Sequence, residues 1–197
     1  VRDPGPGRGI SYRIIQIFTD GTKYSLKAFD EPAEFVRYRN FKIKDRDREG
    51  AARELFDIDA NRKEPRVIVS DNFFLKHPGV KVGDLIELDT PSGRTPFRII
   101  AKSVDFASPT GVFYLSRDVY KRYWKDSLVT GFAMNLAPGA DLEKTRAAIA
   151  QAIGKKYNLV VLSSAEMRKE MKIAIDDSFA YTRAIEGAAL LVALLGL

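Results

Sequence analysis

The chain has 197 residues, a formal net charge of +6, one histidine and no cysteine. This length allows one domain or two small ones with a real core, and the composition excludes collagenous and wholly disordered classes. The lack of cysteine excludes a disulfide framework and a thiolate metal site, and it leaves the redox compartment open. Because Lys and Arg are scattered among Asp and Glu, we expect most of the charge to be solvated surface.

The N-terminal third begins with residues 1–9, which are rich in glycine and proline and contain no apolar stretch. They indicate a linker or a cut end and not a secretory signal. Two β-rich runs follow, 11–19 and 22–29, separated by Asp20-Gly21. This pattern predicts an antiparallel hairpin at the start of the fold.

The middle of the chain predicts a short helix and then a small β-rich unit at 66–126. In chain order we expect a helix at 47–56, a strand at 67–69, a helical turn capped by Ser70 or Asp71 and ended at His77, a hairpin turning at 90–93, a strand at 111–115 and a helix capped by Ser116.

The last third predicts strand, helix and strand, as in a βαβ crossover that covers one face of a sheet. The first strand alternates through Phe132 and Met134, and Asp141 caps the helix. Gly154 is expected to end this helix. The continuous apolar run 159–162 is expected to form the second strand.

A long helix is predicted from about Ser164 into the C-terminal tail, because Ser163 and Glu166 form a capping-box pattern. Residues 187–197 are apolar on every helical face, which is typical of a helix buried in a core or in lipid. Since a bilayer span needs roughly 20 such residues, we expect 177–197 to be the start of a transmembrane helix. The alternative is a C-terminal helix buried in the protein's own core or in a dimer.

Patterns for catalysis and metal binding are weak. His77 is the single histidine, and no Gly-x-Ser-x-Gly elbow accompanies it, so we expect no Ser-His-acid site. The acidic pairs Asp45/Asp47 and Asp57/Asp59 lack the glycine-centred pattern of a calcium loop and are interpreted as solvated charge. We therefore predict no catalytic, cofactor-binding or metal-binding residue, and a protein that is not an enzyme.

Patterns for nucleotide and nucleic-acid binding are also weak. The Gly-x-Gly-x-Gly string at 5–9 follows no strand and precedes no helix, and no Walker-type motif occurs, so another chain would have to bind ATP. Two stretches, 35–44 and 120–125, mix basic and aromatic residues. They indicate binding of single-stranded nucleic acid if the rings are free to stack on bases. They are ordinary structure if the rings enter a core while the charges face water.

Eight short motifs follow one another along the chain from residue 67 onward. They are Val67-Ile-Val-Ser70, Val80-Lys-Val-Gly-Asp-Leu-Ile-Glu-Leu88, Phe97-Arg-Ile-Ile100, Asp105-Phe-x-Ser-x-x-Gly111, Leu115-Ser-Arg-Asp-Val-Tyr120, Leu136-Ala-Pro-Gly-Ala-Asp141, Ser163-Ser-Ala-Glu-Met-Arg168 and Asp177-Ser-Phe179. Together they resemble the extracytoplasmic domain of FtsX-like/MacB-like ABC transporter permeases. The resemblance covers residues 66–197 well and residues 10–65 loosely.

The resemblance implies an α+β fold. A porter-like α/β part, formed by 10–65 and 127–176, flanks a β-rich sabre-like insertion at 66–126, and 177–197 begins a transmembrane helix. It implies a bacterial cytoplasmic (inner) membrane protein with this domain on the periplasmic side, and no catalytic residues within it.

The resemblance also implies partners and a role. The partners are an ABC ATPase subunit, the membrane, and a periplasmic adaptor or second permease copy. The role is export or extraction of a lipid, lipoprotein, peptide or similar amphiphile. A single-span anchored binding domain and a soluble nucleic-acid-binding protein remain the alternatives.

Overall fold

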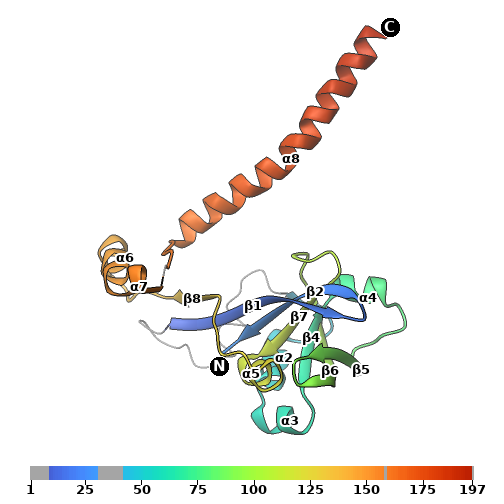
Figure 1. The fold of residues 1–197 in the computed structure, drawn as a ribbon, viewed down its shortest axis with the longest axis vertical. Coiled ribbons are helices and arrows are strands. Elements are labelled where there is room, and N and C mark those ends of the chain that lie inside the picture. The colour runs from blue at the N-terminus through green and yellow to red at the C-terminus, as the bar shows by residue number, and fades with distance from the viewer. Residues whose placement is uncertain (1–8, 31–41, 158, 197) are drawn as a thin grey trace. The chain divides into compact units, whose positions relative to one another are not determined.

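The structure is a computed structural model that describes residues 9–30, 42–157 and 159–196 (Figure 1). The chain divides into two units, Val1–Asn135 and Leu136–Leu197. In chain order the elements are β1 (Gly9–Thr19), β2 (Thr22–Phe29), β3 (Lys42–Ile43), α2 (Arg48–Leu55), α3 (Ile58–Lys63), β4 (Arg66–Ser70), α4 (Asp71–Lys76), β5 (Leu85–Thr90), β6 (Gly93–Val104), β7 (Val112–Ser116), α5 (Arg117–Trp124), β8 (Gly131–Met134), α6 (Leu142–Ile149), η1 (Ala150–Gly154), α7 (Lys155–Tyr157) and α8 (Ser164–Leu195).

The first unit is built on a mixed sheet. The described strands pair in the order β3–β6–β4–β7–β2–β1–β8, and β5 pairs with β6. β2 runs parallel to β7, with Leu26 opposite Phe113, so the N-terminal hairpin and the strands of 66–116 share one sheet. The division into porter-like and sabre-like parts at residues 65/66 and 126/127 stays a prediction about domain layout.

Both predicted hairpins are confirmed. Asp20 and Gly21 have positive φ angles of 49° and 72°, as a type I′ turn requires, and they join β1 to β2 in antiparallel register. The second hairpin joins β5 to β6 through the two turn residues Pro91 and Ser92, and Thr90 pairs with Gly93, whose φ is 106°. Each turn residue therefore sets the register of the strands that it connects.

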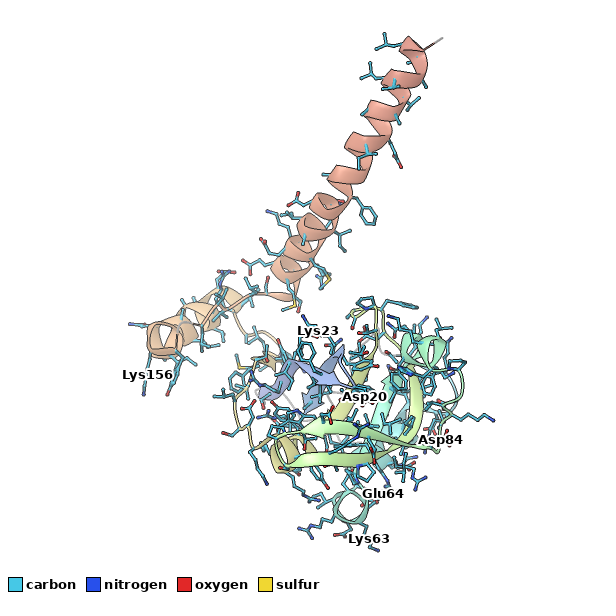
Figure 2. The ribbon with its side chains drawn as sticks, turned by 45° about the vertical axis from the view of Figure 1, so that its right-hand side comes forward. Asp20, Lys23, Lys63, Glu64, Asp84 and Lys156 are labelled. Atoms are coloured by element: carbon cyan, nitrogen blue, oxygen red, sulfur yellow. The ribbon has the colours of Figure 1, made fainter. Side chains whose placement is uncertain are left out.

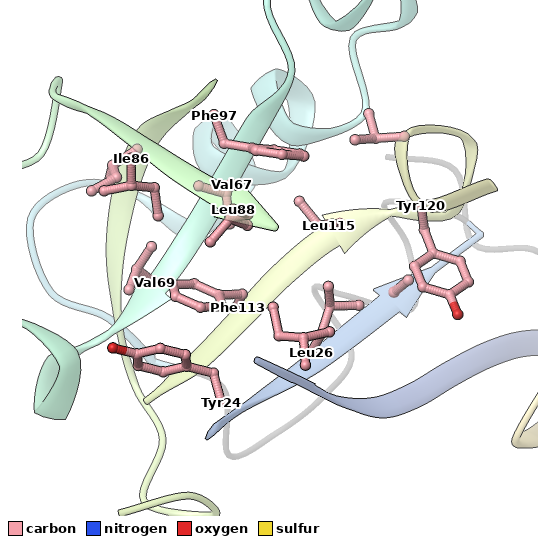
Figure 3. Close-up of a cluster of buried hydrophobic side chains, with 14 of the residues drawn as sticks. Tyr24, Leu26, Val67, Val69, Ile86, Leu88, Phe97, Phe113, Leu115 and Tyr120 are labelled. Atoms are coloured by element: carbon pink, nitrogen blue, oxygen red, sulfur yellow. The ribbon is translucent and has the colours of Figure 1, made fainter. Parts of the chain in front are cut away.

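The two faces of the sheet carry separate apolar cores. One face is covered by α4 and α5, and its core includes the fully buried side chains Leu26, Phe97, Phe113 and Leu115 (Figure 3). The other face is covered by α2, through Ala51, Ala52 and Leu55. This layered arrangement of helices and a mostly antiparallel sheet confirms the predicted α+β class.

Helix caps account for where several elements begin. Asp47 accepts a hydrogen bond from the Gly50 N–H at 2.6 Å and starts α2. Ser116 starts α5 by accepting from the Val119 N–H. Ser70 occupies the cap position of α4, but its hydroxyl makes no capping bond and accepts instead from the Val112 N–H at 2.7 Å. The sequence predicted caps at Ser116 and at Ser70 or Asp71, and of these the Ser116 cap is confirmed.

The second unit differs from the predicted βαβ crossover. α6 begins at its Asp141 cap as expected, but the helical run does not end at Gly154. It continues through η1 and α7, and the Leu159 N–H donates to the Gly154 carbonyl at 3.0 Å. Gly154 is not among the described glycines with positive φ, so it does not form the left-handed cap that would stop the helix.

The strand predicted at 159–162 is not formed. The described elements of this unit are helices, so the segment has no neighbouring strand within the unit for a hydrogen-bonded ladder. A short apolar run has no periodicity that distinguishes a strand from another buried segment. The prediction of a second β-strand at this position is therefore wrong.

The long helix is confirmed. α8 has 32 residues and is drawn as one continuous helix in Figure 1, which corresponds to a length of about 48 Å at 1.5 Å per residue. Among the residues that the structure describes, no helix is long and apolar enough to cross a membrane.

Candidate functional site: the long helix and its anchored start

The start of α8 is held by a complete capping box. The Ser163 hydroxyl accepts from the Glu166 N–H at 3.1 Å, and the Glu166 carboxylate accepts from the Ser163 N–H at 2.8 Å. Two of the free N–H groups at the helix start are satisfied in this way. The sequence pattern Ser-x-x-Glu predicted this contact.

A second contact ties the start of α8 to the preceding helix. Arg146 of α6 donates to the other Glu166 oxygen at 2.6 Å. The Ser163 N–H and Arg146 lower the pKa of Glu166 below its usual value. The carboxylate is therefore ionised at neutral pH and holds both contacts at once.

Beyond its start, α8 has two halves of different character. In the first half Met167, Met171 and Ile175 recur every four residues along one side, among charged residues such as Lys169 and Glu170. The second half exposes large apolar side chains, each between 61% and 82% accessible: Leu190, Leu191, Val192, Leu194 and Leu195. An exposed apolar surface of this kind indicates contact with lipid or with another protein.

His77 lies against two aromatic side chains of the first unit. Its Nε2 lies 3.0 Å from the Tyr24 hydroxyl, and its ring lies 4.4 Å from the Phe73 ring. The hydrogen-bond partner is thus a tyrosine and not a serine nucleophile. That no Ser-His-acid site uses this residue stays a prediction.

The acidic pairs have roles that the sequence did not predict. Asp47 and Asp57 are the N-caps of α2 and α3. Asp45 accepts from the Lys102 N–H at 3.0 Å, and Asp59 lies 3.4 Å from Arg62. In the described part of the chain no group of three or more His, Cys, Asp or Glu could hold a metal ion. Three of the four carboxylates therefore contact backbone N–H groups, and the interpretation as solvated charge was incomplete.

The two basic and aromatic stretches have different outcomes. In 120–125 the rings of Tyr120 and Trp124 are buried, stack at 5.5 Å and belong to the core, while Lys121 and Lys125 are exposed. The core interpretation is confirmed there, since buried rings cannot stack on bases. Most of 35–44 lies outside the described residues.

Two polar hubs were missed by sequence reasoning. Asp126 accepts from the Arg13 Nε at 2.9 Å, the Tyr120 hydroxyl at 2.5 Å and the Leu128 N–H at 2.8 Å. Burial raises the pKa of Asp126, but these hydrogen bonds outweigh it and the net pKa is lowered. Asp105 is held similarly by Lys27 at 2.6 Å. Arg13 lies 113 positions from Asp126 and Lys27 lies 78 positions from Asp105, so no local pattern joins these pairs.

No protein-family model matches the chain. Over 147 residues the chain is 29% identical to an uncharacterized ABC transporter permease protein of Mycobacterium tuberculosis, a match that covers 71% of this chain and 17% of that protein. The chain thus spans about a sixth of the length of this curated relative.

Solved structures give a likeness of fold. The periplasmic region of MacB from Actinobacillus actinomycetemcomitans has a TM-score of 0.58 at 9% identity, covering 87% of this chain and 78% of that one. The extracellular domain of the noncanonic ABC-type transporter YknZ from Gram-positive bacteria has a TM-score of 0.54 at 10% identity, covering 80% and 79%.

These findings define a class of domain: the fold is that of the extracytoplasmic domains of MacB-like transporters. The relative that is similar in sequence over 147 residues is an ABC transporter permease protein. The predicted resemblance to an FtsX-like/MacB-like extracytoplasmic domain is therefore confirmed.

Proposed function

We propose that this chain is the extracytoplasmic domain of an ABC transporter permease subunit. In this proposal it couples a partner ATPase to the export or extraction of a lipid, lipoprotein, peptide or similar amphiphile. The observation that carries the proposal is α8, an uninterrupted helix with an anchored start and an entirely apolar end. The similarity to a permease supports it.

In the proposed arrangement, residues 177–197 begin a transmembrane helix in the bacterial inner membrane and the first unit faces the periplasm. The apolar end of α8 would be buried in lipid, which removes its exposed leucine side chains from water. Movement driven by ATP in the membrane part would then reach the outer domain along α8. A continuous helix suits this task because its backbone hydrogen bonds resist bending.

The proposed partners follow from the same arrangement. The domain itself binds no nucleotide, and an ABC ATPase subunit supplies hydrolysis. A periplasmic adaptor or a second permease copy would contact the outer domain. We propose that this surface is divided into a porter-like part, formed by 10–65 and 127–176, and a sabre-like part, formed by 66–126.

The test is to purify the full-length protein from its native membrane in mild detergent and identify the bound subunits. We expect an ABC ATPase in near-stoichiometric amount, and nucleotide turnover that depends on that subunit. The 197-residue chain alone should hydrolyse no nucleotide. Turnover by this chain alone, abolished by a point change within it, would overturn the proposal, as would a full-length protein without an ATPase partner.

A further inference from the structure

The first unit binds the chain closely at the point where it leads toward the second unit. Residues 125–130, here called the exit connector, join the end of α5 to β8 (Figure 1). Apolar burial does little to hold this segment, since Leu128 is 65% accessible and Ser127 and Thr130 are exposed. Its position therefore depends on polar contacts with neighbouring elements.

A buried arginine at the start of α5 makes the first set of contacts. Arg117 donates from Nη1 to the Leu128 carbonyl at 2.9 Å and from Nη2 to the Ser127 carbonyl at 3.0 Å. Its side chain is 3% accessible, and its Nε lies 3.6 Å from an Asp30 carboxylate oxygen just after β2. Because a buried charge is costly without partners, release of the two carbonyls would leave this guanidinium poorly paired.

The start of β1 makes the second set of contacts. The Thr130 hydroxyl accepts from the Ile14 N–H at 2.9 Å and donates to the Ile14 carbonyl at 3.1 Å. The Thr130 N–H donates to the Tyr12 carbonyl at 2.8 Å. Near the other end of the exit connector, Asp126 accepts from the Arg13 Nε at 2.9 Å. Three consecutive residues of β1 thus hold both ends of the exit connector.

β8, which follows the exit connector, is held less firmly. Among the described strands it lies at one end of the sheet, and it pairs with β1 over four residues, Gly131 to Met134. Phe132 is 57% accessible and Met134 is 49% accessible, so β8 buries little apolar surface. Because the stability of a strand depends on side-chain packing against its neighbours, β8 should open at a lower cost than the exit connector.

We propose that the exit connector is a mechanical clasp. Tension from the C-terminal side detaches β8 from β1 residue by residue, beginning at Met134, and detachment stops at Thr130. From there the load passes into β1 and, through Arg117, into α5, so the apolar cores of the first unit stay intact. This inference concerns the first unit by itself and does not depend on the permease assignment.

Single-molecule pulling on the 197-residue chain tests the clasp. The chain has no native cysteine, so Lys63→Cys and Ala137→Cys together supply two attachment points for DNA handles. Both positions are exposed, and Figure 2 shows Lys63 on the outside of the first unit. As the force rises, a first step should free up to about 25 Å of chain between Thr130 and residue 137. The chain should then pause with the clasp closed.

Variants locate the contacts that cause the pause. Arg117→Gln removes two charge-assisted hydrogen bonds and should shorten the lifetime of the pause at constant force by about tenfold or more. Thr130→Val removes both hydrogen bonds of the hydroxyl at an exposed position and should shorten the lifetime about fivefold. Thr130→Ser keeps the hydroxyl and should restore the lifetime. Ser127→Ala keeps the carbonyl that Arg117 binds and should leave the lifetime unchanged.

Circular dichroism and urea unfolding check that each variant keeps a folded first unit, and Thr130→Val carries the test if Arg117→Gln does not fold. Lengthening of the otherwise unmodified chain without a pause would overturn the proposal. An unaltered pause in Thr130→Val would overturn it too, because the hydroxyl would then bear no load. Shortening by Ser127→Ala as large as that by Thr130→Val would also contradict it, since any change in the exit connector would then have the same effect.

Discussion

Proline at Ile175 tests whether α8 acts as a stiff connection. Ile175 lies in the interior of α8, is half exposed, and is followed by 20 more helical residues up to Leu195. Proline there removes the hydrogen bond from residue 175 to the Met171 carbonyl and clashes with that carbonyl, at a cost of about 3 kcal/mol. Because the side chain is not in a core, the cost falls on the helix and not on packing.

In the full-length protein with its ATPase, Ile175→Pro should leave membrane insertion and ATPase binding intact. Transport per ATP hydrolysed should fall strongly, because a kinked helix absorbs the displacement. Two matched controls isolate stiffness. Ile175→Ala removes the side chain without breaking the helix, and Ser164→Pro puts proline at the first helical position, where it is tolerated. Unchanged coupling in Ile175→Pro at equal expression would refute a stiff-helix role.

Three further predictions concern stability and binding. Asp126→Asn should lower the free energy of unfolding at pH 7 by about 1–2 kcal/mol. The pKa of Asp126 is lowered in the folded protein. Its carboxylate therefore stabilises the fold above the unfolded-state pKa of about 3.9, and this stabilisation is lost as the pH falls through the folded-state pKa. In urea titrations the free energy of unfolding of Asp126→Asn should accordingly fall less with acidification than that of the unmodified chain. Phe97→Ala, at a fully buried site beside Tyr123 and Trp124, should cost about 3–5 kcal/mol in the same assay. DNA and RNA should bind weakly; sub-micromolar affinity at physiological salt in a fluorescence anisotropy titration would favour the nucleic-acid alternative.

Local signals predicted much of the fold. The Asp20-Gly21 turn, the caps at Ser116 and Asp141 and the capping box of Ser163 each depend on residues within four positions of one another. In each case the hydrogen bonds or backbone angles that start the helix or close the turn involve only residues of that short segment. The hairpins and the long helix followed from such segments.

Features that depend on distant neighbours could not be predicted in the same way. The run 159–162 has the composition of a strand, but a strand needs a partner that composition does not supply. The Tyr24 and Phe73 rings pack together in the core because β2, β7 and α4 are brought together, and that requires the parallel pairing of β2 with β7. The hub at Asp126 joins residues 113 positions apart. The fold class was therefore predictable, and the contacts between distant elements were not.

The position of the domain relative to the membrane is tested most directly by cysteine labelling. The chain has no native cysteine, so Asp59→Cys and Leu191→Cys each introduce a single site in a full-length protein stripped of any other cysteine. In this chain the Asp59 side chain is 87% accessible and Leu191 is 61% accessible. A membrane-impermeant maleimide added to intact cells should label Asp59→Cys rapidly and leave Leu191→Cys unlabelled, because lipid covers the apolar end of α8. Labelling of Asp59→Cys only after the membrane is opened, or equally fast labelling of Leu191→Cys, would contradict an extracytoplasmic domain joined to the membrane by α8.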